Sequence, residues 1–157
     1  MEGVSTLTSQ SLDSTDRALI HLLQRDGRRP YTQLAKEVGL SEAAVRQRVQ
    51  RMLDNETMQI VAVTDPLQLG LNRKAMVLIR VDGDAREVAD QLEQIEEVDY
   101  LVVTTGSVDL LAEVVVSDDD ALLALLNDKI RQIRGVLATE TILYLGLRKQ
   151  TYQWGPR

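Results

Sequence analysis

The chain has 157 residues, of which 44% are hydrophobic and 27% are charged. This composition is typical of folded globular proteins and allows one medium domain or two small ones. The absence of cysteine, together with a single histidine, excludes disulfides, zinc-thiolate sites, thiol nucleophiles and histidine-rich metal clusters. The sequence has neither an apolar run of about 18 residues nor a basic leader followed by an apolar core, so we expect a cytoplasmic protein.

The formal net charge of -6 is distributed unevenly along the chain. Residues 28–51 carry six basic and two acidic side chains, a local net charge of +4. From residue 65 onward there are ten basic and sixteen acidic side chains, a net charge of -6. A cationic segment on an otherwise acidic chain favours binding to a polyanion such as DNA. The alternative, from charge alone, is a chance fluctuation on a solvated surface.

Three helices are predicted within the first 63 residues. Residues 1–11 are polar and aperiodic, which predicts a disordered arm before the helices begin. Asp13 is a suitable N-cap for a helix from Ser14 to Gln24, and Gly27 stops it. Pro30 opens a short second helix that ends at Gly39, where a tight turn requires positive φ.

The third helix is expected over the segment SEAAVRQRVQRMLDN, with Ser41 as its N-cap. Two helices that cross at about 90 to 120° need a close contact, a tight turn and an apolar anchor. These are supplied by the small Ala35, by Gly39 and by Val45. The pattern therefore predicts a helix-turn-helix. An ordinary three-helix bundle with a charged face is the alternative.

One side of the third helix carries the side chains that suit DNA. Arginine pairs with guanine, glutamine pairs with adenine, and small alanines allow deep entry into the major groove. The outward face is Glu42, Arg46, Gln47 and Gln50, with Ala43, Ala44, Arg48 and Arg51 along its flanks. Arg28 and Arg29 precede the second helix and suit phosphate contacts. The predicted DNA-binding residues are Arg28, Thr32, Ser41, Glu42, Ala44, Arg46, Gln47, Arg48 and Arg51.

The second half of the chain has the pattern of an α+β domain. A short strand over Gln59–Val63, which would make the first domain winged, is followed by a linker over residues 64–72. We expect domains at residues 12–63 and 73–157. The order within the second domain is strand, helix, strand, strand, helix, strand, which describes a ferredoxin-like βαββαβ sandwich. These elements are Lys74–Val81, Ala85–Ile95, Tyr100–Thr105, Asp109–Val116, Asp120–Arg131 and Leu137–Leu147.

The predicted strands are apolar on both faces. Val77 and Ile79 alternate with Met76 and Leu78, although a sheet that faces water alternates apolar with polar residues. Two helices cover only one face of such a sheet, so we expect the second face to be buried against another copy of the chain. A homodimer would also hold two recognition helices at a fixed separation on DNA.

The segments LDSTDRALIHLLQRDGR, LAKEVGLSEAAVRQRVQRM, DPLQLGL and TGSVD together resemble the Lrp/AsnC (leucine-responsive/asparagine regulator, or feast/famine) family of transcription regulators. The resemblance covers about Leu12 to Tyr152. It implies a helix-turn-helix regulator of amino-acid metabolism or transport genes, with a C-terminal amino-acid-sensing domain. It also implies dimers through the sheet that commonly assemble into octamers.

The resemblance further implies that the loop Thr104–Asp109 lies between dimers and helps to hold a small effector such as an amino acid. The loop's hydroxyls, backbone N–H groups and the Asp109 carboxylate suit that ligand. From the residues alone, a plain hairpin turn at Gly106 is the alternative. The expected effector-binding residues are Thr104, Thr105, Gly106, Ser107, Asp109, Thr139 and Thr141.

Two other functional classes share parts of this fold. A regulatory subunit of an enzyme would share the second fold, but no GxxxxGK[ST], GxGxxG or GxSxG motif supports catalysis, and we expect neither enzymatic activity nor a cofactor. A DNA-architectural protein of low sequence specificity would share the whole fold. The dependence of affinity on DNA sequence distinguishes it from a regulator.

Overall fold

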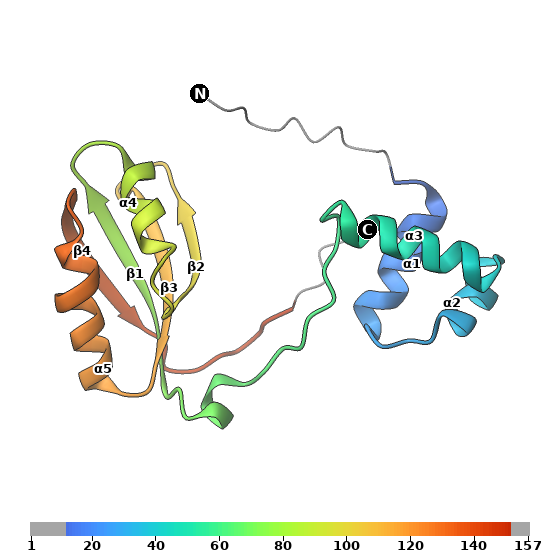
Figure 1. The fold of residues 1–157 in the computed structure, drawn as a ribbon. Coiled ribbons are helices and arrows are strands. Elements are labelled where there is room, and N and C mark those ends of the chain that lie inside the picture. Colours follow the sequence, from blue (N-terminus) through green and yellow to red (C-terminus); the bar gives the residue numbers. More distant parts are fainter. Residues whose placement is uncertain (1–11, 152–157) are drawn as a thin grey trace. The chain divides into compact units, whose positions relative to one another are not determined.

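The computed structural model describes residues 12–151, so the expected disordered arm over residues 1–11 lies outside the described residues. The chain divides into two compact units (Figure 1). The described part of one unit is residues 12–62 with residues 150–151, and the other unit is Val63–Lys149. Within residues 12–151, the helices are too short or too polar to cross a membrane.

The first unit contains the three predicted helices, α1 (Ser14–Arg25), α2 (Tyr31–Val38) and α3 (Glu42–Asp54). Gly39 ends α2 with φ of 69°, a left-handed conformation that costs glycine little. The Ser41 hydroxyl then accepts a hydrogen bond from the Ala44 N–H and caps α3. The helix-turn-helix therefore forms where the sequence predicted it.

A small apolar core joins these three helices. Leu19 of α1, Leu34 of α2, and Val45 and Val49 of α3 each have 0% exposed surface. Burial of each such side chain contributes about 1.5–3 kcal/mol relative to exposure. The apolar stripe of α3 therefore faces inward, and the opposite side of the helix is left to solvent.

The expected strand over Gln59–Val63 is wrong for the single chain. Residues 58–65 form neither helix nor strand, and Ile60, Val61 and Val63 are exposed. A β-rich segment forms a strand only where a neighbouring backbone takes its hydrogen bonds, and residues 59–63 take part in no strand ladder of the described chain. The helix-turn-helix therefore has no wing within residues 12–62. In the expected linker, Pro66–Leu69 forms a 3-10 turn capped by Asp65.

The second unit is a four-stranded antiparallel sheet with helices on one face (Figure 1). Its strand order is β2-β3-β1-β4, the ferredoxin-like arrangement that the order of elements predicted. The strands are β1 (Arg73–Val81), β2 (Val98–Val103), β3 (Leu110–Val116) and β4 (Val136–Leu143). The last strand ends at Leu143, four residues before the predicted end.

Helices α4 (Ala85–Leu92) and α5 (Asp119–Ala124) cover the face that carries Val77 and Ile79. One predicted helix end was wrong, because helix α4 ends at Leu92 rather than Ile95. The second helix continues beyond Ala124 as a π turn (Leu125–Lys129) and a 3-10 turn (Ile130–Gln132), to within one residue of its predicted end at Arg131. Leu125, Leu126 and Ile130, from this continued helix, all reach the core.

The other face of the sheet carries no helix of this unit. Register places Met76 and Leu78 on this open face, and Leu78 pairs with Leu111 across the strands. Exposed apolar side chains continue the surface, including Tyr100 and Ile142. The predicted two-sided hydrophobicity of the strands is therefore present, with one face uncovered in the single chain.

One polar cluster interrupts the apolar open face. The Glu113 carboxylate accepts a hydrogen bond from the Tyr144 hydroxyl at 2.9 Å and forms an ion pair with Lys74 Nζ at 2.8 Å. Burial, together with the neighbouring carboxylate of Glu113, raises the pKa of Tyr144 to about 12. The three side chains thus satisfy one another in partly buried surroundings.

Candidate functional site

The outward side of α3 forms an open hollow in the first unit. The hollow has a volume of about 630 Å³. It is lined by Tyr31, Ala43, Arg46, Gln47, Gln50, Arg51, Asp54 and Asn55. Because Val45, Val49 and Met52 fill the opposite side of the helix, this surface is free of core contacts. We call Ala43, Arg46, Gln47 and Gln50 the outer face of α3.

Arg46 is the cation of the outer face. Its guanidinium lies 4.9 Å from the centroid of the Tyr31 ring, and its Nη2 forms an ion pair with Glu42 at 3.0 Å. A planar guanidinium that lies over an aromatic ring carries its donors at its edge, and the donors of Arg46 that Glu42 does not take are available to a base or a phosphate. Tyr31 and Glu42 thereby orient Arg46 toward the solvent side of the helix.

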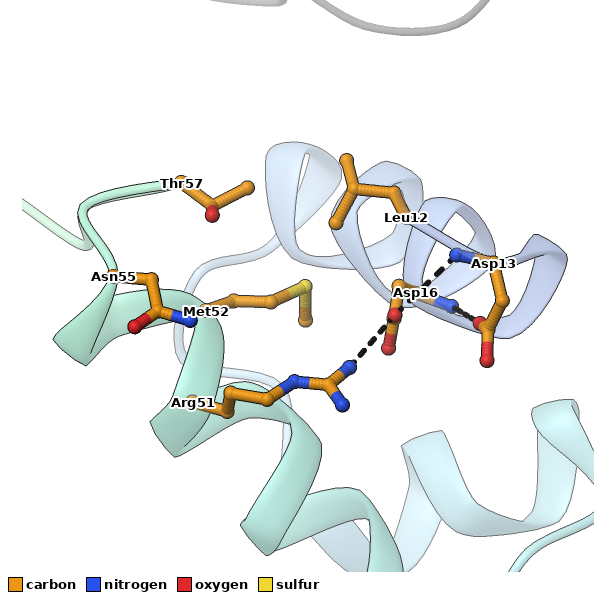
Figure 2. Close-up of a pocket in the computed structure, with 7 residues that line it drawn as sticks. All are labelled: Leu12, Asp13, Asp16, Arg51, Met52, Asn55 and Thr57. Carbon is orange, nitrogen blue, oxygen red and sulfur yellow. Dashed lines mark hydrogen bonds and ion pairs between the residues drawn. The ribbon is translucent and has the colours of Figure 1, made fainter. Parts of the chain in front are cut away.

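Arg48 and Arg51 have a different environment from Arg46. Nη1 of Arg48 contacts Asp13 Oδ2 at 2.6 Å and Asp16 Oδ1 at 2.8 Å. Nη2 of Arg51 contacts Asp16 Oδ2 at 2.8 Å, as Figure 2 shows. We call these four residues the Asp-Arg cluster. It joins the first turn of α1 to the middle of α3.

Asp13, Asp16 and Arg51 of the Asp-Arg cluster line a small polar cavity (Figure 2). The cavity measures about 100 Å³, and its lining includes Leu12, Asn55 and Thr57. Asp13 and Asp16 also form a capping box, in which each side chain accepts a hydrogen bond from the other residue's backbone N–H. The hydrogen bond from the Asp16 N–H and the Arg48 guanidinium lower the pKa of Asp13. The Asp13 and Asp16 carboxylates raise the pKa of Arg48.

The other residues predicted to bind DNA lie at three separate positions in the first unit. Arg28 and Thr32 are exposed near the start of α2, whereas Arg29 forms an ion pair with Glu37. The Ser41 hydroxyl caps α3, and Ala44 is half-buried one turn later. Sequence reasoning missed Tyr31, whose stacking on Arg46 joins two helices. The signal that could have found it is an aromatic residue at the first position of the second helix.

The loop between β2 and β3, which holds most of the predicted effector residues, is closed by its own hydrogen bonds. The Thr104 hydroxyl donates to the Val108 carbonyl at 2.7 Å, and the Thr104 N–H donates to the Asp109 carbonyl at 2.8 Å. Gly106 has φ of 123°, so the turn requires glycine. Thr105, Gly106 and Ser107 are exposed at the tip.

Asp109 joins this loop to the central strand of the sheet. Its carboxylate accepts a hydrogen bond from the Val81 N–H at 2.8 Å, and its own N–H donates to the Ile79 carbonyl at 2.9 Å. The carboxylate that was expected to take the ammonium of an effector therefore already has a backbone partner. Asp109 Oδ1 remains the oxygen available to a further donor.

Thr139 and Thr141 lie on β4, beside β1. Thr139 pairs with Ile79 and Thr141 with Val77, so Thr139 reaches the same end of the sheet as the β2–β3 loop. The Thr139 hydroxyl accepts a hydrogen bond from Arg131 Nε at 2.9 Å. The Thr141 hydroxyl is buried and has no hydrogen-bond partner among the described residues. The Thr141 hydroxyl is therefore without a partner in the described chain, whereas the Thr139 hydroxyl has one.

Two sequence families match successive parts of the chain. Residues 12–53 match the AsnC-type helix-turn-helix domain, and residues 74–154 match the Lrp/AsnC ligand binding domain. An HTH-type transcriptional regulator of Pyrococcus furiosus is 35% identical over 143 residues, which cover 90% of this chain and 97% of the relative. The relative is thus similar along nearly its whole length.

Solved structures agree with this match. The leucine response regulatory protein LrpA of Mycobacterium tuberculosis is similar with a TM-score of 0.82 and 30% identity, covering 92% of this chain and all of that one. E. coli AsnC is similar with a TM-score of 0.80 and 27% identity, covering 89% and 96% of the two chains. With both domains matched in order, the chain belongs to the Lrp/AsnC family of helix-turn-helix transcriptional regulators.

Proposed function

We propose that this regulator recognises specific DNA sequences through the outer face of α3. The observation that carries the proposal is the exposure of Arg46 and Gln47 beside the open hollow, on a helix whose other side is fully buried. Arginine and glutamine form paired hydrogen bonds with guanine and adenine in the major groove. Arg28 and Thr32, at the start of α2, suit contacts to phosphates.

We also propose that the chain acts as a homodimer formed through the open face of the sheet. Met76, Leu78 and Leu111 make this face apolar, and the unit itself supplies no helix to cover it. A second copy would bury the face and would hold two α3 helices at a fixed separation, as paired half-sites require. We further propose that the dimers assemble into an octamer. We propose the cytoplasm as its location, where it has access to DNA.

The second domain is proposed to hold a small effector, an amino acid by class, at the end of the sheet that carries both the loop Thr104–Asp109 and Thr139. The exposed N–H groups at the tip of the loop suit a carboxylate, and the unpaired Thr141 hydroxyl suits a polar ligand atom. Asp109 contributes through Oδ1, since Oδ2 accepts from Val81. Genes of amino-acid metabolism or transport are the proposed targets.

The decisive experiment selects duplexes from a random-sequence pool with the full-length protein and then measures affinity for a selected and a scrambled duplex at one salt concentration. We expect the selected duplex to bind about a thousandfold or more tightly. Equal affinity for both duplexes would instead identify an architectural protein. Repeating the titration with each amino acid tests the effector, and an unchanged affinity with all of them would reject it.

A further inference from the structure

We infer that Arg48 and Arg51 act as positioning residues rather than as DNA contacts, and that the buried Asp16 carboxylate sets the orientation of α3. The inference rests on the proposed recognition of DNA by α3 and assigns a role to residues on one flank of that helix. It reverses the expectation from sequence, in which both arginines were candidates for DNA binding.

The Asp16 carboxylate, in the first turn of α1, is buried. The Asp16 side chain has 2% exposed surface, and within residues 12–151 Asp16 is the only charged residue that is buried as a whole. A buried carboxylate is costly unless charged or hydrogen-bonding partners surround it. Asp16 has a guanidinium on each oxygen, at 2.8 Å from Arg48 and at 2.8 Å from Arg51. Both arginines therefore compensate the buried charge, although the Arg48 side chain is 28% exposed and that of Arg51 is 46% exposed.

The ion pairs of Arg48 and Arg51 with Asp16 are directional, unlike the other contacts of α3 with the core. Val45, Val49 and Met52 attach α3 to the core by apolar contacts, which are not directional. Charge-assisted hydrogen bonds are directional, and those of Arg48 and Arg51 fix the rotation of α3 about its own axis against α1. On the other flank, Arg46 stacks on Tyr31 of α2. The helix is thus held on both sides of its outer face.

Asp13 supports the same arrangement from the end of α1. Its Oδ1 accepts from the Asp16 N–H at 2.7 Å, while its Oδ2 contacts Arg48 at 2.6 Å. The capping box holds the backbone of the first turn, so both carboxylates that meet Arg48 start from a fixed position. The ion pairs consequently join two rigid helices.

Positioning and phosphate contact make different predictions for the dependence of binding on salt. An arginine that neutralises a phosphate adds about 0.9 to the slope of log affinity against log salt, and its loss weakens all sequences alike. A positioning arginine adds nothing to that slope. Its loss misaligns the outer face of α3 and so reduces the preference for the selected duplex over the scrambled one.

The test compares Arg48→Gln, Arg51→Gln and Asp16→Asn in the full-length protein with the parent, using the selected and scrambled duplexes over a salt series. We expect all three variants to lose about tenfold or more in preference, with no decrease in the salt slope. The double variant Asp16→Asn/Arg48→Gln should lose less than the sum of the two single losses, because the two side chains share one ion pair. Glu56→Gln, at an exposed carboxylate after α3, is the control matched in charge to Asp16→Asn, and Arg25→Gln, at the exposed end of α1, is the control matched to the two arginine variants.

Two results would overturn the inference while leaving the proposed function intact. One is a salt slope that falls by about 1 in Arg48→Gln and Arg51→Gln with sequence preference retained. The other is an unchanged preference in all three variants. Thermal unfolding identifies a variant that has failed to fold, and Arg51→Gln, which leaves the Asp16–Arg48 pair in place, is the mildest change. A parent protein without sequence preference would instead reject both proposals.

Discussion

At the scale of single residues, the arginines of α3 differ in what surrounds them. Arg46 is exposed and stacked on Tyr31, whereas Arg48 and Arg51 contact the Asp13 and Asp16 carboxylates. A helical wheel treats all three as members of one polar surface. Which of them can reach DNA depends on residues more than 30 positions earlier in the chain.

We predict that Arg46→Ala and Gln47→Ala each reduce the preference for the selected duplex, because each removes side-chain atoms that pair with a base. The expected loss is about 1–3 kcal/mol for a bidentate contact. Titration of selected and scrambled duplexes measures it. Arg25→Ala, at the exposed end of α1, is the control. Variants as tight and selective as the parent would show that another face reads the DNA.

Asp109 carries a second prediction at this scale. Asp109→Ala leaves the Val81 N–H without its acceptor, so we expect the second domain to lose about 1–3 kcal/mol of stability in denaturant unfolding. Asp109→Asn, which keeps an oxygen acceptor, should lose less, and Ser107→Ala at the exposed loop tip should lose little. The proposed amino-acid response should disappear in Asp109→Ala. A variant as stable as the parent would argue against the structural role.

At the scale of elements, the residue that caps the start of α1 also affects the stability of the fold at low pH. Asp13 caps its own helix and also pairs with Arg48 of α3. Its pKa is lower in the folded state than in the unfolded chain, where it is about 3.9. Ionised Asp13 therefore stabilises the fold above about pH 4, and this contribution is lost as the pH falls through the lowered pKa.

We predict that Asp13→Asn lowers the thermal midpoint of the first domain at neutral pH and that the difference from the parent shrinks below about pH 4. Asparagine remains a good N-cap, so the variant removes the charge while keeping the cap. Circular dichroism of the helices across a pH series measures the effect. Asp26→Asn, at the other end of α1, is the comparison. A difference independent of pH would mean that the Asp13 charge is not responsible.

At the scale of the whole molecule, the open face of the sheet determines the proposed assembly. Leu78 and Leu111 form its centre, and Lys74, Glu113 and Tyr144 form a polar cluster on the same face. An apolar surface with a satisfied polar cluster is suited to association with a defined register. Assembly also fixes how many recognition helices meet one DNA molecule.

We predict that Leu78→Lys dissociates the homodimer, because the interface would then bury a charged ammonium group in place of an apolar side chain. The side chain can reach solvent in the monomer, so folding should survive. Sedimentation or light scattering measures the mass of the particle. Leu123→Lys, on an exposed position of α5 away from the open face, should leave the mass unchanged. A dimeric Leu78→Lys variant would place the interface elsewhere.

The sequence by itself determined the order of elements and the helix-turn-helix, because these depend on local rules. Gly39 and Ser41 mark the turn through φ and capping, and the alternation of Val77 and Ile79 with Met76 and Leu78 marks a sheet with two apolar faces. The helix and strand ends that were predicted incorrectly involve tertiary packing. The π turn after Ala124 and the unpaired segment over Gln59–Val63 depend on which neighbours the backbone finds.

Only the tertiary structure decided the roles of individual polar side chains. The pairing of Asp16 with Arg48 and Arg51 joins residues 32 and 35 positions apart, and that of Asp109 with Val81 joins residues 28 apart. Such contacts follow from how helices and strands pack and leave no local periodicity. The sequence states the chemical type of each side chain. The fold determines which partner that side chain has, and therefore whether it is available to a ligand.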